Sequence, residues 1–325
     1  MPVNGSPENL IKEMKMTPPE KVREHLAAWA QSATGLVEAL QGKEAVDWNE
    51  ARSTYDRAMA ELFPAPEGIS IAETLLNDIP ACSITPDEIK ENRTLFYIHG
   101  GGYASGSPKG YLGLAGRLAL LLRAKAYIPD YRLAPQHCFP IPIDDVVRAY
   151  RAVIDLGHDP RSIIIAGDSA GGAMVVTLMR KLRDGGLPLP AVGFAMSPWA
   201  NLTHTGRSMR TREHLDPACT PEFLTLLAQN FLGNALPTDP DASPVYADVC
   251  GLPPVLIHIG ENELMLSDAI RLAAHLGENR VRVSLEVWPG MFHVWHLFAG
   301  VLPEADEALG NAVSWLEGVL SRVNA

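Results

Sequence analysis

Short apolar runs alternate with longer amphipathic segments from about residue 68 to the end of the chain. The apolar runs predict strands over residues 94–99, 124–131, 162–167, 191–197, 254–260 and 281–288, and residues 68–86 predict two shorter strands around a turn. The segments between them predict helices over residues 109–123, 143–156, 171–184, 266–276 and 303–322. Continuous apolar strands alternating with helices indicate an α/β fold, with a mostly parallel sheet covered by helices on both faces.

Two regions depart from this alternation. Residues 1–62 are charged and rich in Ala and Leu, are interrupted at Pro18 and Pro19, and predict several helices. Residues 200–250 are rich in proline and polar residues and contain one helical stretch, PEFLTLLAQNFLG, without an obvious strand. We expect the two regions to form a helical cap above the sheet. The predicted organisation is an N-terminal cap segment at 1–62, core at 63–199, a cap insertion at 200–250 and core at 251–325.

The strongest candidate for chemistry is Ser169, within the motif G-x-S-x-G at residues 167–171. The motif directly follows an apolar strand and opens a helical pattern, which is the strand–turn–helix context of a nucleophile elbow. A tight turn there exposes the hydroxyl, and small neighbours allow close approach of the backbone. We therefore predict that Ser169 is a nucleophile; the alternative is a glycine-rich turn with a structural role.

A glycine run follows the predicted strand at residues 94–99, as His99-Gly100-Gly101-Gly102. Acyl transfer through a tetrahedral intermediate needs N–H donors aimed at the oxyanion, and glycine lets the backbone come close. We predict Gly100 and Gly101 as donors, together with the N–H of Ala170 at the start of the following helix. A phosphate-binding loop is the alternative, but the run lacks both a following Lys-Ser/Thr and a G-x-G-x-x-G pattern.

A serine nucleophile needs an imidazole base. His293 lies a few residues past the last predicted strand, on a glycine-containing loop, and is the predicted base; His296 is the alternative. The other candidates fit other roles: His258 lies within a strand pattern, and His99 is expected to shape the glycine loop. We expect three further histidines to lie in loops or in the cap and to be structural or solvent-exposed: His137, His204 and His214.

The acid that orients the base should lie between the serine and the histidine in the chain. Glu261, Glu263 and Asp268 all follow the predicted strand at 254–260. Glu263 is the predicted acid, because a carboxylate at the end of that strand can reach His293. Asp268 is the alternative acid. If it is not the acid, Asp268 is expected to be a capping or solvated carboxylate on the next helix.

Composition narrows the classes of partner. The net charge is −11, from 27 Lys and Arg against 38 Asp and Glu, which disfavours nucleic acid and anionic membranes. The cysteines form no CxxC pair, so no metal site is expected; they are Cys82, Cys138, Cys219 and Cys250. We find neither an apolar run of signal-peptide length at the N-terminus nor a membrane-length apolar segment, which predicts a cytoplasmic protein.

These motifs together resemble the hormone-sensitive-lipase family of α/β-hydrolases, also called the bacterial family IV carboxylesterases. The resemblance rests on HGGG at 99–102, YRLAP at 131–135, GDSAGG at 167–172 and the late His293, and covers the chain from about residue 65. The family's acid motif usually reads G-x-x-D-P-L, whereas this chain has Glu263 at the Asp position, as members of the GDSAG subgroup do.

The resemblance implies an eight-stranded, mostly parallel sheet with a helical cap, and hydrolysis of short- to medium-chain carboxylic esters without a cofactor. It also implies a small-molecule ester as substrate and a homodimer formed through an edge strand. An amidase or carbamate hydrolase with the same triad is the alternative activity, and a non-catalytic ligand-binding protein is a second. Arg132 and the acidic pair Asp144 and Asp145 are expected to form scaffold pairs beneath the site.

Overall fold

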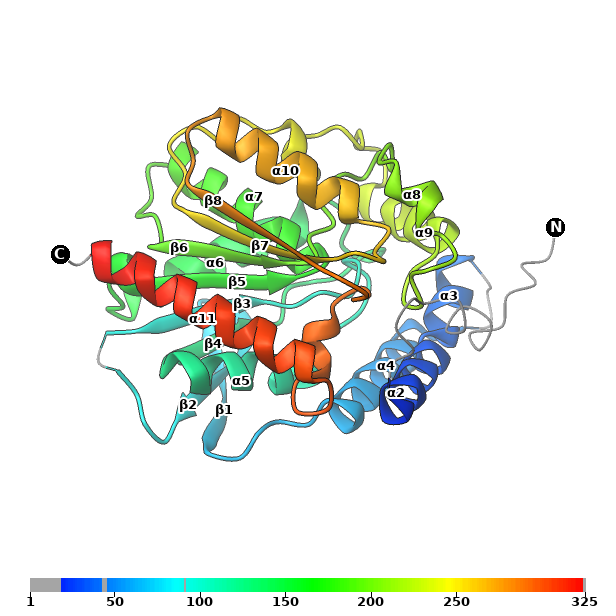
Figure 1. Cartoon of the computed structure of the whole chain (residues 1–325), viewed down its shortest axis with the longest axis horizontal. Coiled ribbons are helices and arrows are strands. Elements are labelled where there is room, and N and C mark those ends of the chain that lie inside the picture. Colours follow the sequence, from blue (N-terminus) through cyan, green and yellow to red (C-terminus); the bar gives the residue numbers. More distant parts are fainter. Residues whose placement is uncertain (1–18, 43–45, 91, 324–325) are drawn as a thin grey trace.

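The computed structural model describes residues 19–42, 46–90 and 92–323. Eight strands form one sheet in the order β1-β2-β4-β3-β5-β6-β7-β8 (Figure 1). The strands are β1 (Ile69–Leu76), β2 (Ile79–Pro86), β3 (Thr94–Ile98), β4 (Lys125–Pro129), β5 (Ile163–Asp168), β6 (Val192–Met196), β7 (Val255–Gly260) and β8 (Val283–Trp288). All six predicted core strands and the predicted pair at 68–86 are therefore present.

The sheet is parallel except at one edge. The pairs β4–β3, β3–β5, β5–β6, β6–β7 and β7–β8 are all parallel. The hairpin of β1 and β2 pairs antiparallel with β4. This is the predicted mostly parallel, eight-stranded sheet of the α/β-hydrolase fold.

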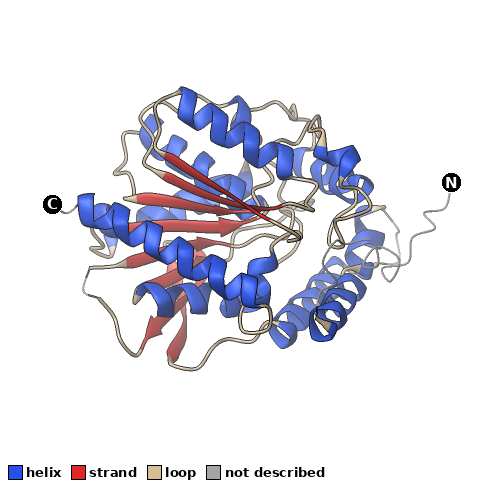
Figure 2. Ribbon diagram, viewed as in Figure 1, coloured by secondary structure: helices blue, strands red, loops and turns tan. Residues whose placement is uncertain are grey.

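Helices cover both faces of the sheet (Figure 2). The helices are α2 (Glu20–Ser32), α3 (Thr34–Leu40), α4 (Trp48–Leu62), α5 (Leu112–Leu122), α6 (Ile141–Asp155), α7 (Ala170–Asp184), α8 (Ser208–Thr211), α9 (Pro221–Leu232), α10 (Leu266–Glu278) and α11 (Pro303–Val323). Helices α6, α7 and α10 share one apolar core with the sheet, whereas α5 and α11 share the other.

Strand β5 illustrates why the central strands read as uninterrupted apolar runs. Ile163 and Ile165 point into the core of α6 and α7, and Ile164 and Ala166 point into the core of α5 and α11. Successive side chains of a strand face opposite sides, so a strand with helices on both sides needs apolar residues at every position.

The helices of the predicted cap lie beyond the carboxyl ends of the central strands. Figure 1 shows α2, α3 and α4 on that side of the molecule together with α8 and α9. The two groups touch, since the side chain of Asn230 on α9 donates a hydrogen bond of 3.3 Å to the carbonyl of Leu40 on α3. Residues 1–18 and 43–45 of the predicted N-terminal segment lie outside the described residues, and no described helix is long and apolar enough to cross a membrane.

Candidate active site

Ser169 lies on a sharp turn between β5 and α7. Its backbone has φ 53° and ψ −117°, a conformation that non-glycine residues rarely adopt. The turn is packed tightly against β3: a Cβ added to Gly171 would lie 2.1 Å from the carbonyl oxygen of Ile98, and one on Gly167 would lie 2.7 Å from the same oxygen. The glycines of the motif are therefore required by the close approach of these two backbone segments.

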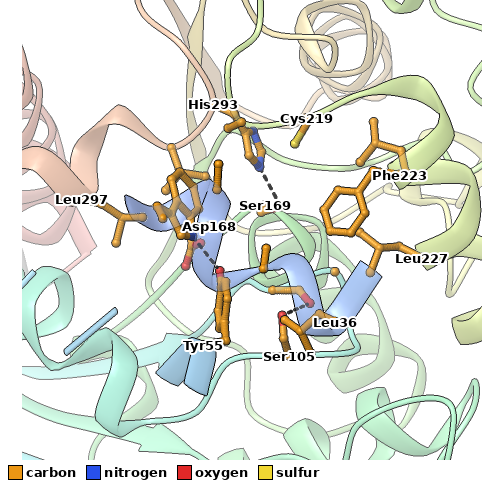
Figure 3. A pocket seen from close by; sticks show the side chains of 18 of the residues that line it. Leu36, Tyr55, Ser105, Asp168, Ser169, Cys219, Phe223, Leu227, His293 and Leu297 are labelled. Atoms are coloured by element: carbon orange, nitrogen blue, oxygen red, sulfur yellow. Dashed lines mark hydrogen bonds between the residues drawn. The ribbon is translucent and has the colours of Figure 1, made fainter. Parts of the chain in front are cut away.

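Ser169, His293 and Glu263 form a continuous chain of hydrogen bonds, and Figure 3 shows its first link, from His293 to Ser169. The Oγ of Ser169 lies 2.9 Å from Nε2 of His293, and Nδ1 of His293 lies 2.9 Å from Oε2 of Glu263. Ser169 is 8% exposed, His293 4% and Glu263 0%. The structure thus brings together the serine, histidine and glutamate that the sequence predicted, at the carboxyl ends of three strands.

The second oxygen of Glu263 is held by two further donors. Oε1 accepts hydrogen bonds from the N–H of Gly260 at 2.6 Å and from Oγ of Ser197 at 2.7 Å. Ser197 also accepts a bond from the N–H of Val294, the residue after His293, at 3.1 Å. Ser197 therefore links the acid to the histidine loop, and the sequence analysis missed it. Its position at the carboxyl end of the predicted strand 191–197 was the available signal.

The two alternatives for these roles lie elsewhere. Asp268 is fully buried in the first turn of α10, where burial raises its pKa to about 8. His296 is 3.2 Å from the ring of His258, and burial holds the pKa of His296 well below its ordinary value. Neither side chain joins the hydrogen-bond chain of Ser169.

Burial and nearby charges shift the pKa of His293 in opposite directions. Burial alone would lower the pKa of His293, but the hydrogen bond and charge of Glu263, together with the charges of Asp216 and Asp168, raise it above the ordinary value near 6.5. Burial raises the pKa of Glu263, and the hydrogen bond and charge of His293 oppose that shift. The imidazolium form of His293 is thus favoured by its surroundings.

The glycine loop differs from the sequence prediction at one donor. The N–H of Gly100 donates to Oδ1 of Asp168 at 3.0 Å, and the same oxygen accepts the hydroxyl of Tyr97 at 2.7 Å. Gly100 is therefore wrong as an oxyanion donor, because its N–H is already bonded within the chain. Gly101 and Gly102, by contrast, line the same pocket as Ser169.

The residues around the glycine loop act mainly as its support. Nδ1 of His99 donates a hydrogen bond to the carbonyl of Gly100 at 2.8 Å, and the ring stacks on Tyr131 with the ring centres 4.2 Å apart. The hydroxyl of Tyr131 donates to the carbonyl of His99 at 2.8 Å. These contacts agree with the predicted role of His99 in shaping the loop.

The predicted scaffold pair of Arg132 is formed with one acid only. Arg132 makes a two-point contact with the buried Asp145, through Nε at 2.8 Å and Nη2 at 2.7 Å. Asp144 instead forms an ion pair with Lys181 at 3.3 Å, so the expectation that both acids pair with Arg132 was wrong. Adjacent residues of a helix point in directions about 100° apart, which explains the difference.

A largely apolar pocket opens above Ser169. Helices α2 and α3 supply one wall and α9 the opposite wall, with Phe223 and Leu227 facing the serine in Figure 3. The apolar lining from these helices comprises Leu26, Trp29, Ala30, Ala33, Leu36, Phe223, Leu224 and Leu227. Within the described ranges, no group of three or more His, Cys, Asp or Glu side chains is placed to hold a metal ion, and all four cysteines are free.

Comparison with known proteins places this site in a family. Residues 95–297 match the family model described as alpha/beta hydrolase fold. An acetyl-hydrolase of Streptomyces hygroscopicus is 39% identical over 227 residues, which is 70% of this chain and 76% of that protein. A putative acetyl-hydrolase LipR of Mycobacterium tuberculosis is 34% identical, over 79% of this chain and 83% of that protein.

Solved structures agree with the sequence relatives. An esterase from the bacterial hormone-sensitive lipase (HSL) family superposes with a TM-score of 0.86 at 33% identity, covering 94% of this chain and 100% of that one. The fold and site define an α/β-hydrolase. The chain belongs to the hormone-sensitive-lipase family of these enzymes, as its motifs predicted.

Proposed function

We propose that this enzyme is a carboxylesterase that hydrolyses short- to medium-chain carboxylic esters with Ser169 as nucleophile, His293 as general base and acid, and Glu263 as the orienting acid. The observation that carries the proposal is the continuous hydrogen-bond chain through these three side chains at the floor of an apolar pocket. The relatives support the reaction class, because they are named esterases, carboxylesterases and acetyl-hydrolases.

In the acylation half of the reaction, Oγ of Ser169 attacks the ester carbonyl carbon while Nε2 of His293 accepts the hydroxyl proton. Glu263 accepts the Nδ1–H of His293, which fixes the tautomer and stabilises the imidazolium. The imidazolium then gives its proton to the leaving alcohol oxygen as the ester C–O bond breaks, and Ser169 is left acylated.

Water completes the cycle. His293 accepts a proton from the attacking water, and the oxygen adds to the acyl carbon. Collapse of the second tetrahedral intermediate breaks the bond to Oγ, and His293 returns the proton to Ser169. The carboxylic acid then leaves the pocket.

The oxyanion of both tetrahedral intermediates is assigned to the N–H groups of Gly101, Gly102 and Ala170. Gly101 and Gly102 line the pocket beside Ser169, and Ala170 is the first residue of α7. In the described part of the chain none of the three N–H groups has a hydrogen-bond acceptor. The start of a helix adds partial positive charge at the position where negative charge develops.

The pocket favours neutral, apolar esters. We propose that helices α2 to α4 and the insertion at 200–250 act as its cap, since α2, α3 and α9 supply the apolar walls. We also propose a cytoplasmic homodimer. Four free cysteines fit a reducing compartment, and β8 lies at an open edge of the sheet with Val287 44% exposed, which fits pairing of two copies through this strand.

The test is hydrolysis of p-nitrophenyl esters from acetate to palmitate by the wild type, by Ser169→Ala and by the control Ser314→Ala, whose serine lies exposed on α11. We expect turnover to peak at short or medium acyl chains and kcat to fall by a factor on the order of 10⁶ in Ser169→Ala alone. Near-normal hydrolysis by folded Ser169→Ala would contradict the assignment. Turnover of matched anilides but not esters by the wild type would favour an amidase instead.

A further inference from the structure

Asp216, in the loop between α8 and α9, is a buried carboxylate outside the proposed triad. It is 1% exposed, and within the described residues no Lys or Arg forms an ion pair with it. Its oxygens are held by backbone donors: Oδ2 accepts from the N–H of Leu264 at 3.0 Å, and Oδ1 from the N–H of Ala218 at 3.1 Å. Keeping a buried carboxylate ionised without a paired cation is costly, so the contacts that Asp216 makes bear on what it does.

The bond to Leu264 reaches the residue next to Glu263. The segment at 261–267, called here the acid loop, runs from the end of β7 into the start of α10 and is held by residues 208–216 at several points. These contacts are Arg212 Nε to the carbonyl of Glu261 at 2.8 Å, Ser208 Oγ to the carbonyl of Leu264 at 2.5 Å, and the N–H of Ser267 to Ser208 Oγ at 2.9 Å. The predicted cap insertion therefore sets the position of the loop that carries the acid.

Asp216 also acts on the site through its charge. After the dominant effect of burial, the charge of His293 lowers the pKa of Asp216, and the charge of Asp216 in turn helps to raise that of His293. It also adds to the raising effect of burial on the pKa of Glu263. The titratable groups whose charges interact with that of His293 are Glu263 from the acid loop, Asp216 from the α8–α9 loop, Asp168 from the end of β5, and His296 from the 3-10 turn Trp295–Phe298. The thiol of Cys219 lines the same pocket, and burial raises its pKa well above the ordinary value.

The charge state of His293 decides how these carboxylates interact. In their ionised forms, Asp216 and Glu263 repel each other while His293 is neutral, and each raises the pKa of His293. When His293 takes the proton of Ser169, the imidazolium attracts both of them. Asp216 therefore favours the charged state of the reaction over the resting state, and an interaction that is stronger in the transition state than in the ground state accelerates the chemical step.

We propose that Asp216 is a positioning residue for ester hydrolysis: it fixes the acid loop so that Glu263 faces His293, and its buried charge stabilises the imidazolium that forms during acylation. The inference rests on the proposed function of the triad. It assigns part of the catalytic apparatus to the predicted cap insertion.

The experiment compares Asp216→Asn with the control Asp239→Asn. Asp239 lies in the same insertion and likewise accepts the N–H two residues ahead, from Asp241 at 2.9 Å, but it does not contact the acid loop. In the Ser169→Ala background, the imidazole protons of His293 are titrated by NMR. We expect Asp216→Asn to lower the pKa of His293 and Asp239→Asn to leave it unchanged.

Steady-state kinetics with intact Ser169 give the second measurement. We expect Asp216→Asn to lower kcat by about 10-fold, to leave KM within about 2-fold, and to move the acid limb of kcat to lower pH. An unchanged His293 titration in the folded variant would overturn the charge role. Because that titration needs no turnover, its outcome is independent of whether the enzyme hydrolyses esters.

Ser208→Ala separates position from charge. It removes two bonds to the acid loop but no charge, so we expect a several-fold lower kcat, of the order of 3- to 30-fold, with the titration of His293 retained. Circular dichroism establishes that each variant is folded. If Asp216→Asn does not fold, Ser208→Ala carries the test of positioning, and a wild-type kcat in that variant would overturn it.

Discussion

The floor and the walls of the pocket are built by different means. At the floor, the elbow and the glycine loop hold backbone conformations that few residues tolerate. A Cβ on Gly101 would lie 2.1 Å from the carbonyl oxygen of Ser105, and a Cβ on Gly171 would lie 2.1 Å from the carbonyl oxygen of Ile98. In the walls, α2, α3 and α9 present ordinary apolar side chains, such as Leu36 and Leu227, in regular helices.

Because of this difference, we expect the floor to determine the reaction rate and the walls to determine the choice of ester. Backbone atoms in van der Waals contact fix the reacting groups, and a change of one methyl group there forces the chain to move. Apolar walls tolerate changes of shape and size at modest cost. We therefore expect substitutions at the floor to change kcat by orders of magnitude, and substitutions in the walls to change the choice of ester with a smaller effect on rate.

The largest effect after loss of Ser169 is expected for Glu263→Gln. The amide cannot stabilise the imidazolium or select the right tautomer, so kcat should fall by about 10⁴-fold. The wild-type acid limb should lie above pH 6.5, because Glu263 raises the pKa of His293. Without that charge burial dominates and lowers this pKa, so the limb should move to lower pH. Rates on p-nitrophenyl butyrate from pH 5 to 9 measure both effects.

Asp268→Asn is the matched control for that variant. Burial raises the pKa of Asp268 to about 8, so the group is mainly a neutral acid at pH 7, and an amide resembles it closely in shape and charge. We expect kcat to stay within about 3-fold of wild type. The reverse pattern, with Asp268→Asn inactive and Glu263→Gln active, would transfer the acid role to Asp268.

Gly101→Ala probes the glycine loop. Gly101 has φ +101°, and the added methyl group would meet the carbonyl of Ser105, so the loop must shift and carry its N–H donors with it. Loss of one oxyanion donor typically lowers kcat by about 10²- to 10³-fold, with a smaller change in KM. Binding of a trifluoromethyl ketone, which forms a tetrahedral adduct with the serine, should weaken in parallel.

The control for Gly101 is Gly186→Ala. Gly186 also has a positive φ, of +64°, but a Cβ there would have no neighbour within 4 Å. It therefore carries the same kind of backbone cost without a clash near the site, and we expect nearly full kcat with a stability loss of about 1 kcal/mol. Equal losses of kcat in both variants would mean that strain alone, rather than displaced donors, accounts for the effect.

The contrast also explains what could be predicted from the sequence. Strands β3 and β5 to β7 read as apolar runs because both faces are buried, and the glycine motifs read clearly because close backbone contacts admit no other residue. The order of motifs then led to Ser169, His293 and Glu263. The misassigned donor, Gly100, shows where this reasoning ends: which N–H of a glycine run is free depends on Asp168, a contact between β5 and the loop after β3.

Residues that act through tertiary contacts were the hardest to predict. Ser197, just past the end of β6, and Asp216, in the α8–α9 loop, both hold the acid segment. The only signal for Ser197 was its place at the end of a predicted strand, and Asp216 lies in no motif. The pocket walls were equally hidden, because Trp29 and Leu227 are indistinguishable in sequence from the many other apolar residues of their helices. Only the placement of α2 and α9 above the sheet gives them a role.

The smallest effect is expected in the walls, from Leu227→Ala on α9. The side chain of Leu227 packs over the glycine loop, since a Cβ on Gly102 would lie 2.6 Å from its Cδ1, so its removal enlarges the pocket next to Ser169. We expect the ratio of kcat/KM for octanoate over butyrate esters to rise by about 10-fold, in keeping with 1–3 kcal/mol for small apolar differences in a pocket. Leu232→Ala, a buried leucine of the same helix outside the pocket lining, should lose comparable stability and leave that ratio unchanged. A ratio unaffected by Leu227→Ala would place the acyl chain away from α9. A fall in kcat as large as that of Gly101→Ala would show that this wall also positions the reacting groups, and the separation of floor from walls would then be wrong.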